Sequence, residues 1–396
     1  MADVWLECPA CHFQTRLGPV FTGCEVCLRQ DSAVPLEVRY GSVHPSNDGT
    51  EGSGLWRWRE LLPPVAGNLT LGEGNTPLLP LSGNGGPALF FKNETQNPTW
   101  SWKDRPGCVS VAMAREFGFS RVAAISTGNL GNSVAAYATA AGLDCTIFCH
   151  PESPTLQVAQ MMNYGAKVVR GGDQPALLRS LILEDGCFPC SSLYTQYGCS
   201  NPFGVEGLKT IAFEIYVQLG NQVPDLIFVP VGSGDGIYGI WKGFRELRDC
   251  GLAGKTPRMI ACQASGADSL FRAFEKRGSH VNPLASVGTV ALSVGELAAG
   301  DHALRAVYES EGTVMVSTDP ETFDAMHVLM RHGYAVEPAS AIAFSCAMKS
   351  APAGPSGETW IVIGSGAAVK WPECLLRGFE MPPVLTAGSA GSVVPF

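Results

Sequence analysis

The sequence predicts an α/β protein made of two parallel-sheet α/β domains, with a small zinc ribbon at the N-terminus. Three observations predict this class: short β-branched runs alternate with helical patterns from residue 105 onward, glycine-rich loops join some of these runs to the next helix, and paired cysteines lie within the first thirty residues. Repeated strand and helix patterns favour parallel sheets covered by helices on both faces. The 396 residues, 45% of them hydrophobic, exclude a disordered or fibrous protein.

The charge balance argues against two classes of partner. With 27 Lys and Arg against 36 Asp and Glu, the net charge of −9 repels nucleic-acid phosphates and anionic membrane surfaces. The longest apolar runs, such as residues 227–231, are far shorter than the roughly 20 residues that span a bilayer. The first residues carry no secretory signal, and fourteen cysteines are too few for a disulfide scaffold in this chain. We therefore expect a soluble, cytoplasmic protein that binds neither nucleic acid nor membranes.

Four cysteines near the N-terminus predict a metal site. Cys8 and Cys11 form one Cys-x-x-Cys pair, and Cys24 and Cys27 form a second pair after twelve intervening residues. Each pair lets two thiolates on one tight turn reach a single tetrahedral Zn²⁺, so both pairs together complete a closed, structural site. The alternative, four unrelated buried cysteines, is disfavoured by the paired spacing.

A further Cys-x-x-Cys motif consists of Cys187 and Cys190. It has no partner pair nearby in the sequence, so ordinary half-buried thiols are favoured over a redox or metal role.

The rest of the chain divides by composition. A polar, glycine-rich stretch at 41–55 predicts a linker or long loop, so the catalytic body is expected to begin near Trp56. The last sixteen residues, 381–396, carry no charge and are predicted to form an extended tail. Strands are predicted over 122–126, 145–149, 167–170, 226–231, 259–263, 313–316 and 360–363, and helices over 131–141, 155–164, 175–183, 236–247 and 320–331.

Two glycine-rich loops follow predicted strands and open predicted helices. Residues 232–236, Gly-Ser-Gly-Asp-Gly, suit a phosphate because backbone amides at a helix N-terminus point at an anion. The loop lacks the P-loop and G-x-G-x-x-G patterns, so a tight structural turn is the alternative, and Asp235 is expected to point away from any phosphate. The second loop, 126–132, brings hydroxyl and amide side chains to the end of its sheet and suits a carboxylate.

Lys103 is the candidate catalytic residue. It lies at the predicted start of a helix, after the turn at 97–99. The helix dipole disfavours a cation at this end, which makes a neutral amine available for Schiff-base chemistry. The ordinary alternative is a solvated surface lysine.

Seven segments, in order, resemble the threonine synthase family of pyridoxal-phosphate enzymes, which share fold type II with the tryptophan synthase β-subunit. The resemblance runs from about residue 72 to residue 370 and includes the zinc-ribbon-like N-terminus of one branch of threonine synthases. The segments are 72–78, 92–94 with 97–105, 126–129, 201–210, 232–236, 337–341 and 363–366.

The resemblance implies a role for each candidate residue. Lys103 would form the internal aldimine with pyridoxal 5′-phosphate and, once displaced by the substrate amine, shuttle protons at the α-carbon. Asn129 would hydrogen-bond the phenolic oxygen of the cofactor, and Ser365 is the candidate hydroxyl facing its pyridine nitrogen. The cofactor phosphate would be bound by Gly232, Ser233, Gly234, Asp235 and Gly236. The substrate carboxylate or leaving group would be bound by Ser126, Thr127 and Gly128.

The same resemblance implies a division into domains. Residues 1–35 would form the zinc-ribbon-like segment, 36–118 with 205–380 a large cofactor-binding domain, and 119–204 a small mobile substrate domain, with 381–396 as the tail. Because family members are commonly dimers, we expect a homodimer with a small amino-acid substrate.

Two departures from the family pattern leave the reaction open. Gly204 replaces an arginine that helps bind the phosphate of O-phosphohomoserine, and glycine cannot imitate a planar guanidinium. The usual Gly-Ser-Phe-Lys becomes Trp-Ser-Trp-Lys at 100–103. Either another cation, such as Lys209 or Arg105, binds the phosphate, or the substrate is a different one.

Three hypotheses follow. The leading one is a threonine-synthase-like lyase, which would convert O-phosphohomoserine to threonine and phosphate. The alternative is β-elimination or β-replacement on a serine-, threonine- or diaminopropionate-like amino acid. A zinc-ribbon binding module with an inactive enzyme body is disfavoured, because residues 1–35 hold two basic side chains against four acidic ones and the lysine and both glycine loops are intact.

Overall fold

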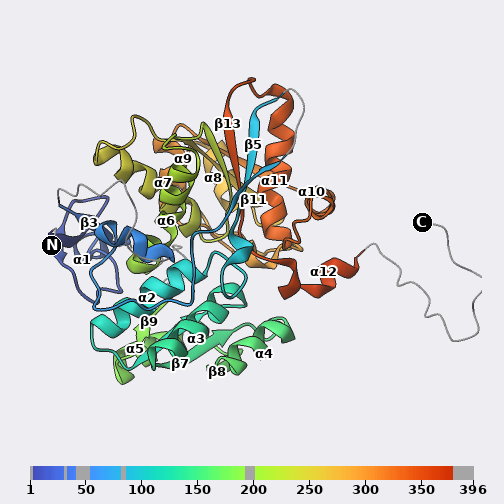
Figure 1. Cartoon of the computed structure of the whole chain (residues 1–396). Coiled ribbons are helices and arrows are strands. Elements are labelled where there is room, and N and C mark those ends of the chain that lie inside the picture. The colour runs from blue at the N-terminus through green and yellow to red at the C-terminus, as the bar shows by residue number, and fades with distance from the viewer. Residues whose placement is uncertain (1–2, 31–33, 42–53, 82–85, 192–200, 378–396) are drawn as a thin grey trace, which may run out of the picture.

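The computed structural model describes residues 3–30, 34–41, 54–81, 86–191 and 201–377. Their strands form three sheets, and helices flank the two larger sheets (Figure 1). The predicted linker at 41–55 lies largely outside the described residues, and the predicted tail at 381–396 lies wholly outside them. The division into domains stays a prediction.

The N-terminal sheet is small and antiparallel, in the order β2-β1-β3. Its strands are β1 (Val4–Glu7), β2 (Gln14–Arg16) and β3 (Glu37–Tyr40), with the short helix α1 (Glu25–Leu28) beside them. β3 also contacts the body of the protein, because the hydroxyl of Tyr40 donates a hydrogen bond of 2.5 Å to Glu206 and Arg245 donates one of 2.9 Å to Glu37.

The largest sheet has six strands, all parallel except the edge strand β4. In order across the sheet they are β12 (Thr313–Ser317), β11 (Arg258–Ala264), β10 (Leu226–Pro230), β13 (Thr359–Gly364), β5 (Ala88–Asn93) and β4 (Leu78–Leu81). β13 and β5 lie side by side although they come from opposite ends of the chain (Figure 1).

Helices cover both faces of this sheet. One face packs against α6 (Pro202–Gln218), α7 (Asp235–Asp249), α8 (Ser269–Glu275) and α9 (Asp301–Glu309), and the other against α10 (Asp319–Arg331) and α11 (Pro338–Ser350). Along β10 the side chains alternate, with Ile227 and Val229 in the first core and Leu226 and Phe228 in the second. Both faces are therefore apolar, as expected of a parallel sheet.

The third sheet has four parallel strands in the order β8-β7-β6-β9. They are β8 (Lys167–Arg170), β7 (Asp144–Cys149), β6 (Arg121–Ile125) and β9 (Phe188–Pro189). The helices packed around it are α2 (Asp104–Glu116), α3 (Asn129–Ala141), α4 (Thr155–Asn163) and α5 (Gln174–Asp185).

The short helices are η1 (Gly54–Leu61), η2 (Glu94–Gln96), η4 (Leu292–Val294), η5 (Ala351–Ala353), η6 (Ala368–Lys370) and α12 (Pro372–Leu376). The prediction of an α/β protein with two parallel-sheet layers is confirmed, and each predicted strand and helix has a counterpart within a few residues of its predicted bounds. Helices α6, α8, α9 and α11, and strands β4, β5 and β9, had no specific prediction.

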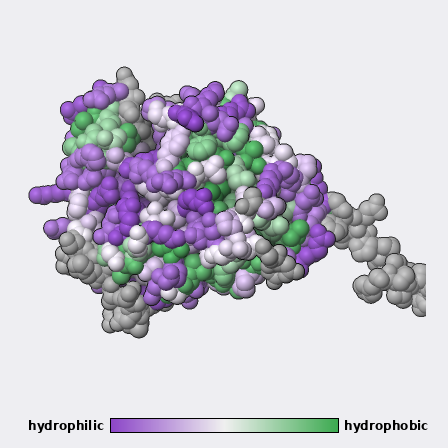
Figure 2. Space-filling model, turned by 90° about the horizontal axis from the view of Figure 1, so that it is seen from above, coloured by the Kyte–Doolittle hydropathy of each residue, from purple (hydrophilic) through white to green (hydrophobic). Residues whose placement is uncertain are grey.

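Among the described helices, none combines the length and the apolar character that crossing a membrane requires. The face shown in Figure 2 mixes hydrophilic and hydrophobic patches, as most protein surfaces do.

Candidate active site

A pocket of about 190 Å³ lies where the carboxyl ends of β6 and β10 meet the N-termini of α2, α3 and α7. All the predicted cofactor and substrate residues line it: Lys103, Ser126, Thr127, Gly128, Asn129, Gly232, Ser233, Gly234, Asp235, Gly236 and Ser365. These residues come from segments far apart in the sequence, which the parallel topology brings to one place.

Lys103 is the residue that precedes α2 and caps its N-terminus. Its carbonyl oxygen accepts two hydrogen bonds, one from Gly107 N (2.9 Å) and one from the hydroxyl of Ser133 on α3 (2.8 Å). Trp100, three residues earlier, adopts a left-handed conformation with φ of 65°, which is uncommon for a bulky side chain. Lys103 is therefore presented to the pocket by a constrained turn.

Asp104 stabilises the same turn. Its carboxylate accepts hydrogen bonds of 2.6 Å from both the amide and the hydroxyl of Thr99. Burial raises the pKa of Asp104 to about 6, although the bonds from Thr99 favour the charged form. The hydrogen bonds between Thr99 and Asp104 close the turn at 99–104, which contains Lys103.

Trp102 joins the lysine turn to the glycine loop at the start of α7. Its ring packs so closely on Gly236 that a Cβ atom at that position would overlap the ring. Trp102 N also donates a hydrogen bond of 2.9 Å to the carbonyl of Ser365. The large ring, which departs from the family pattern, thus fills the space between three pocket-lining segments.

The loop at 232–236 has the geometry of an anion site. Gly234 is the N-cap residue of α7 with φ of 102°, a conformation that favours glycine, and it has no side chain with which to cap the amides of the first turn. Ala303 of α9 lies 2.5 Å from where a Cβ of Gly234 would be, so the loop has no room for a side chain there. The free amides and the positive end of the helix dipole fit a phosphate.

The loop at 126–129 also ends at a helix N-terminus. The hydroxyl oxygen of Ser126 accepts hydrogen bonds from Gly128 N (3.2 Å) and Gly131 N (2.9 Å). Gly128 is the N-cap residue of α3 and has no side chain, so the Ser126 hydroxyl caps the amide of Gly131 in the first turn. The loop could therefore hold a small anionic group such as a carboxylate.

A buried polar network surrounds Asn129. The amide nitrogen of Asn129 donates to the two carboxylate oxygens of Glu337 (3.2 and 3.0 Å), and Lys370 Nζ donates to its amide oxygen (2.8 Å). Burial lowers the pKa of Lys370 to about 8, while Asp104 and Glu337 act in the opposite direction. The indole nitrogen of Trp371 donates a further bond of 2.7 Å to Glu337. This network fixes the orientation of the Asn129 amide.

The roles of Glu337 and Lys370 were not predicted from the sequence. Their partner Asn129 lies 208 and 241 positions away. The one available signal was the position of Glu337 within the segment 337–341, which carried no assigned role.

Ser365 lies just after β13, at the end of the six-stranded sheet. Its hydroxyl is 3.1 Å from that of Ser340 and 3.4 Å from a carboxylate oxygen of Glu337. The side chain is buried, and it lines the pocket as a neutral hydroxyl.

The alternative in which Arg105 or Lys209 binds a substrate phosphate is disfavoured by the place of both side chains in the structure. Both side chains are fully buried and away from the pocket lining. Arg105 pairs with Glu94 and Glu214 (2.7 Å each), and Lys209 pairs with Glu206 and Glu246. If either cation left its place, its carboxylate partners would remain buried without a counter-ion, which costs free energy. Arg105 and Lys209 therefore stay in the core. Among the described residues that line the pocket, Lys103 is the one lysine or arginine.

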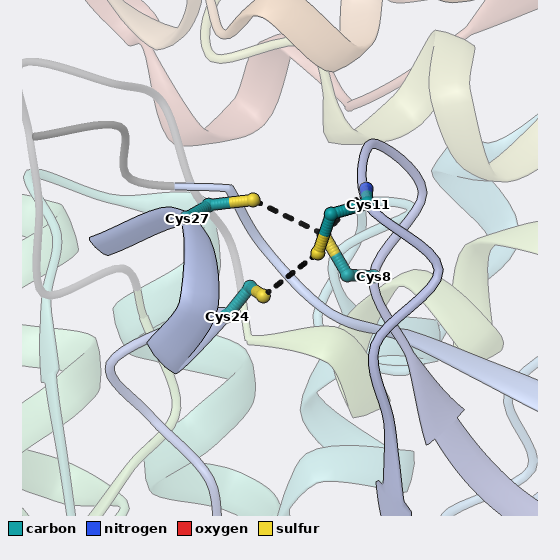
Figure 3. A group of neighbouring side chains, drawn as sticks. All are labelled: Cys8, Cys11, Cys24 and Cys27. Atoms are coloured by element: carbon teal, nitrogen blue, oxygen red, sulfur yellow. Dashed lines mark hydrogen bonds between the residues drawn. The ribbon is translucent and has the colours of Figure 1, made fainter. Parts of the chain in front are cut away.

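The four N-terminal cysteines come together in space (Figure 3). Their sulfur atoms all lie within 4.8 Å of one another, with Cys8 and Cys27 at 3.7 Å and Cys11 and Cys24 at 3.5 Å. Four sulfurs at about 2.3 Å from a tetrahedral Zn²⁺ are separated by roughly 3.8 Å, so these spacings fit a zinc site with four thiolate ligands.

Cys187 and Cys190 flank β9 and are both buried. Burial raises the pKa of Cys187 to about 12 and raises that of Cys190 as well. A thiol that stays protonated is a poor nucleophile and metal ligand, so these residues fit the interpretation as ordinary thiols, although they are buried rather than half-buried.

Comparisons with known proteins agree with this geometry. The family model described as "Pyridoxal-phosphate dependent enzyme" matches residues 69–366. A threonine synthase of Methanocaldococcus jannaschii is 37% identical over 345 residues, which cover 83% of this chain and 84% of that protein. A threonine synthase of Methanosarcina acetivorans is 34% identical over 398 residues, which cover 96% of each chain.

Solved structures share the fold at lower identity. Maize serine racemase superposes with a TM-score of 0.64 at 21% identity, covering 76% of this chain and 90% of the racemase. A fungal L-serine ammonia-lyase from Rhizomucor miehei superposes with a TM-score of 0.64 at 18% identity, covering 77% of this chain and 98% of the ammonia-lyase.

Proposed function

From the premise that this chain belongs to the pyridoxal-phosphate-dependent enzyme family, we propose how its pocket performs the reaction of a threonine-synthase-like lyase. The observation that carries the proposal is the single pocket that unites Lys103, the loop at 126–129 and the loop at 232–236. A lysine, a glycine-capped helix N-terminus for a phosphate and a second helix N-terminus for a carboxylate are the groups that such a lyase requires.

The residues present fit the cofactor. The bare amides of the loop at 232–236 would hold its phosphate, Lys103 its carbonyl carbon, Asn129 its phenolic oxygen and Ser365 its pyridine nitrogen. When bound, pyridoxal 5′-phosphate supplies an electron sink that stabilises negative charge at the substrate α-carbon.

The side chains that line the pocket have separate roles in the proposed reaction. The amine of Lys103 removes the α-proton of the substrate and returns it, because the turn at 99–104 holds the lysine beside the pocket. Ser126, Thr127 and Gly128 bind the substrate carboxylate at the N-terminus of α3. The rings of Trp102 and Trp371 line the pocket and exclude water from it.

The contact between Trp102 and Gly236 gives a first prediction. Gly236→Ala is expected to weaken pyridoxal 5′-phosphate binding by roughly tenfold, because the added methyl group displaces either the Trp102 ring or the start of α7. Titration of the protein with the cofactor, followed by fluorescence, measures the affinity. Gly254→Ala is the control, since a Cβ there meets nothing within 4 Å. Trp102→Phe in the Gly236→Ala background should recover part of the lost cofactor affinity, because the smaller ring leaves room for the methyl group. An unchanged cofactor affinity in Gly236→Ala would contradict the close packing of Trp102 on Gly236.

We propose O-phosphohomoserine as the first candidate substrate, with threonine and phosphate as products after addition of water. The support is the similarity to threonine synthases over most of the chain. The second candidate is β-elimination on a serine- or threonine-like amino acid. It is favoured by the described pocket lining, in which no arginine faces the substrate, and by the position of Gly204, buried in the first turn of α6.

A substrate panel separates the two candidates. Incubation with O-phosphohomoserine is expected to release phosphate and threonine in equal amounts, and incubation with threonine, serine or diaminopropionate to release no keto acid. Ammonia and keto acid from the second group, without phosphate release from the first, would replace the first candidate by the second.

We also propose that Cys8, Cys11, Cys24 and Cys27 bind one structural zinc ion. The double variant Cys8→Ala, Cys11→Ala is expected to lose the roughly one equivalent of zinc found by metal analysis, since two thiolates do not complete a closed tetrahedral site. The matched control is Cys187→Ala, Cys190→Ala, which should retain zinc. Equal zinc contents in the N-terminal double variant and the wild type would contradict the assignment.

Finally, we propose a cytoplasmic homodimer. None of the described cysteines forms a disulfide, which fits a reducing compartment. Light scattering of the purified protein tests the oligomeric state.

A further inference from the structure

The loop proposed to bind the cofactor phosphate contains a carboxylate. Asp235 is the first residue of α7, and its side chain is largely buried beside the uncapped amides of that helix. Asp235 follows the N-cap residue Gly234 and so lies in the first turn, where the positive end of the helix dipole attracts a negative charge. A free Asp235 carboxylate would therefore compete with a phosphate for the same amides and also repel it.

The structure holds this carboxylate aside. One oxygen of Asp235 lies 3.0 Å from Nε2 of His302, and the other accepts a hydrogen bond of 3.1 Å from the hydroxyl of Ser233. An ionised carboxylate only accepts hydrogen bonds, so Nε2 of His302 is the donor. The other ring nitrogen, Nδ1, has no hydrogen-bond partner among the described residues, which leaves Asp235 as the polar partner that orients the ring.

His302 is itself firmly placed. Its side chain is 8% exposed, and its ring meets that of Tyr238 edge-on at 5.2 Å. It is the second residue of α9, and this helix packs directly on the glycine loop: Gly300 N donates a bond of 2.9 Å to the carbonyl of Ser233. The imidazole is therefore fixed relative to the loop by the backbone as well as by its ring contact.

We propose that His302 is a positioning residue for cofactor binding, which draws the Asp235 carboxylate away from the N-terminus of α7 and so leaves the helix amides free for the phosphate. This inference rests on the proposed role of the loop at 232–236. It assigns a function to a histidine outside the pocket lining, acting on the cofactor through a neighbouring carboxylate.

The test compares two ligands that differ in the phosphate alone. Binding of pyridoxal 5′-phosphate and of pyridoxal to the apoenzyme is measured by fluorescence or absorbance titration for His302→Phe, which keeps an aromatic ring against Tyr238 and removes the donor. Affinity for the phosphorylated ligand is expected to fall about tenfold or more, with affinity for pyridoxal unchanged. His302→Gln, which can still donate to Asp235, should bind the phosphorylated ligand more tightly than His302→Phe does.

Two further variants sharpen the test. Asp235→Asn in the His302→Phe background should restore most of the affinity, because the neutral amide no longer repels the phosphate. His280→Phe is the matched control: His280 also pairs with an aspartate, Asp301 at 2.7 Å, but it is exposed and lies outside the glycine loop.

The possible results separate a failure of the role of His302 from a failure of the proposed function. Equal losses for both ligands, or unchanged affinity for the phosphorylated ligand in His302→Phe, would overturn the inference and leave the proposed function intact. A wild-type protein that binds neither ligand would overturn the proposed function and this inference together.

Discussion

Replacing Lys103 with alanine is expected to abolish the visible absorbance of the bound cofactor and to lower turnover by about a thousandfold or more. The pocket supports this because Lys103 is the one lysine or arginine among its described lining residues, so no neighbouring amine there can substitute for it. The nearby Lys370 donates to Asn129 and is buried behind that residue. Absorbance spectra of the purified variant and an initial-rate assay on the reactive substrate measure the two effects.

A second variant separates charge from covalent chemistry. Lys103→Arg keeps the cation at the start of α2 but cannot act as a neutral amine. It should be as inactive as Lys103→Ala while unfolding at a similar denaturant concentration to the wild type. Substantial turnover in either variant would contradict the assignment of Lys103 as the catalytic base.

Arg105→Met is expected to lower the free energy of unfolding by about 3–5 kcal/mol, or to prevent folding altogether. The guanidinium is fully buried and bonds Glu94 and Glu214, each within 2.8 Å. Its removal leaves two buried carboxylates with Lys92 as the remaining cation. Urea unfolding followed by circular dichroism measures the change.

The control for this prediction lies on the same helix. Arg115→Met changes an exposed arginine of α2 whose one hydrogen bond to the described residues is 3.3 Å long and ends on a backbone carbonyl, so the free energy of unfolding should change by less than about 0.5 kcal/mol. A similar small change in Arg105→Met would show that the buried ion pairs contribute little.

The pH dependence offers an independent check. Burial alone would raise the pKa of Glu214, but Arg105 and Lys92 lower it below its ordinary value. A carboxyl whose pKa is lowered by folding adds stability above its unfolded pKa of about 4.5, and this stability is lost as the pH falls from there toward the lowered pKa of the folded state. The wild type should therefore lose stability on acidification more steeply than Arg105→Met does.

Local patterns predicted much of this structure. The loops at 126–129 and 232–236 could be located because each is a short polar, glycine-rich stretch between a β-branched run and a helical pattern. The cysteine pairs could be assigned to one site for a similar reason, since ligand spacing within a tight turn is a property of the local chain. Such features need no knowledge of distant contacts.

Other elements had no such signal. Residues 202–216 of α6 are buried on every side, so the helix lacks the apolar stripe that marks an amphipathic helix. The burial of Arg105 and Lys209 was missed because a charged residue in the sequence does not reveal that its counter-ions arrive from other helices. The network of Asn129, Glu337 and Lys370 depends on contacts across more than 200 residues, and composition and spacing carry no trace of them.

The strand β3 has a consequence for how the enzyme could be shortened or recombined. Tyr40, at its end, bonds Glu206 and lies 4.1 Å under the ammonium of Lys209, inside the charged core between α6 and α7. A chain that began after β3 would expose this cluster to water and leave Glu206 without its hydroxyl donor. The N-terminal segment with the four cysteines therefore cannot be removed without affecting the core. An exchange of this segment with that of a relative would require Tyr40 and its partner Glu206 to be exchanged together.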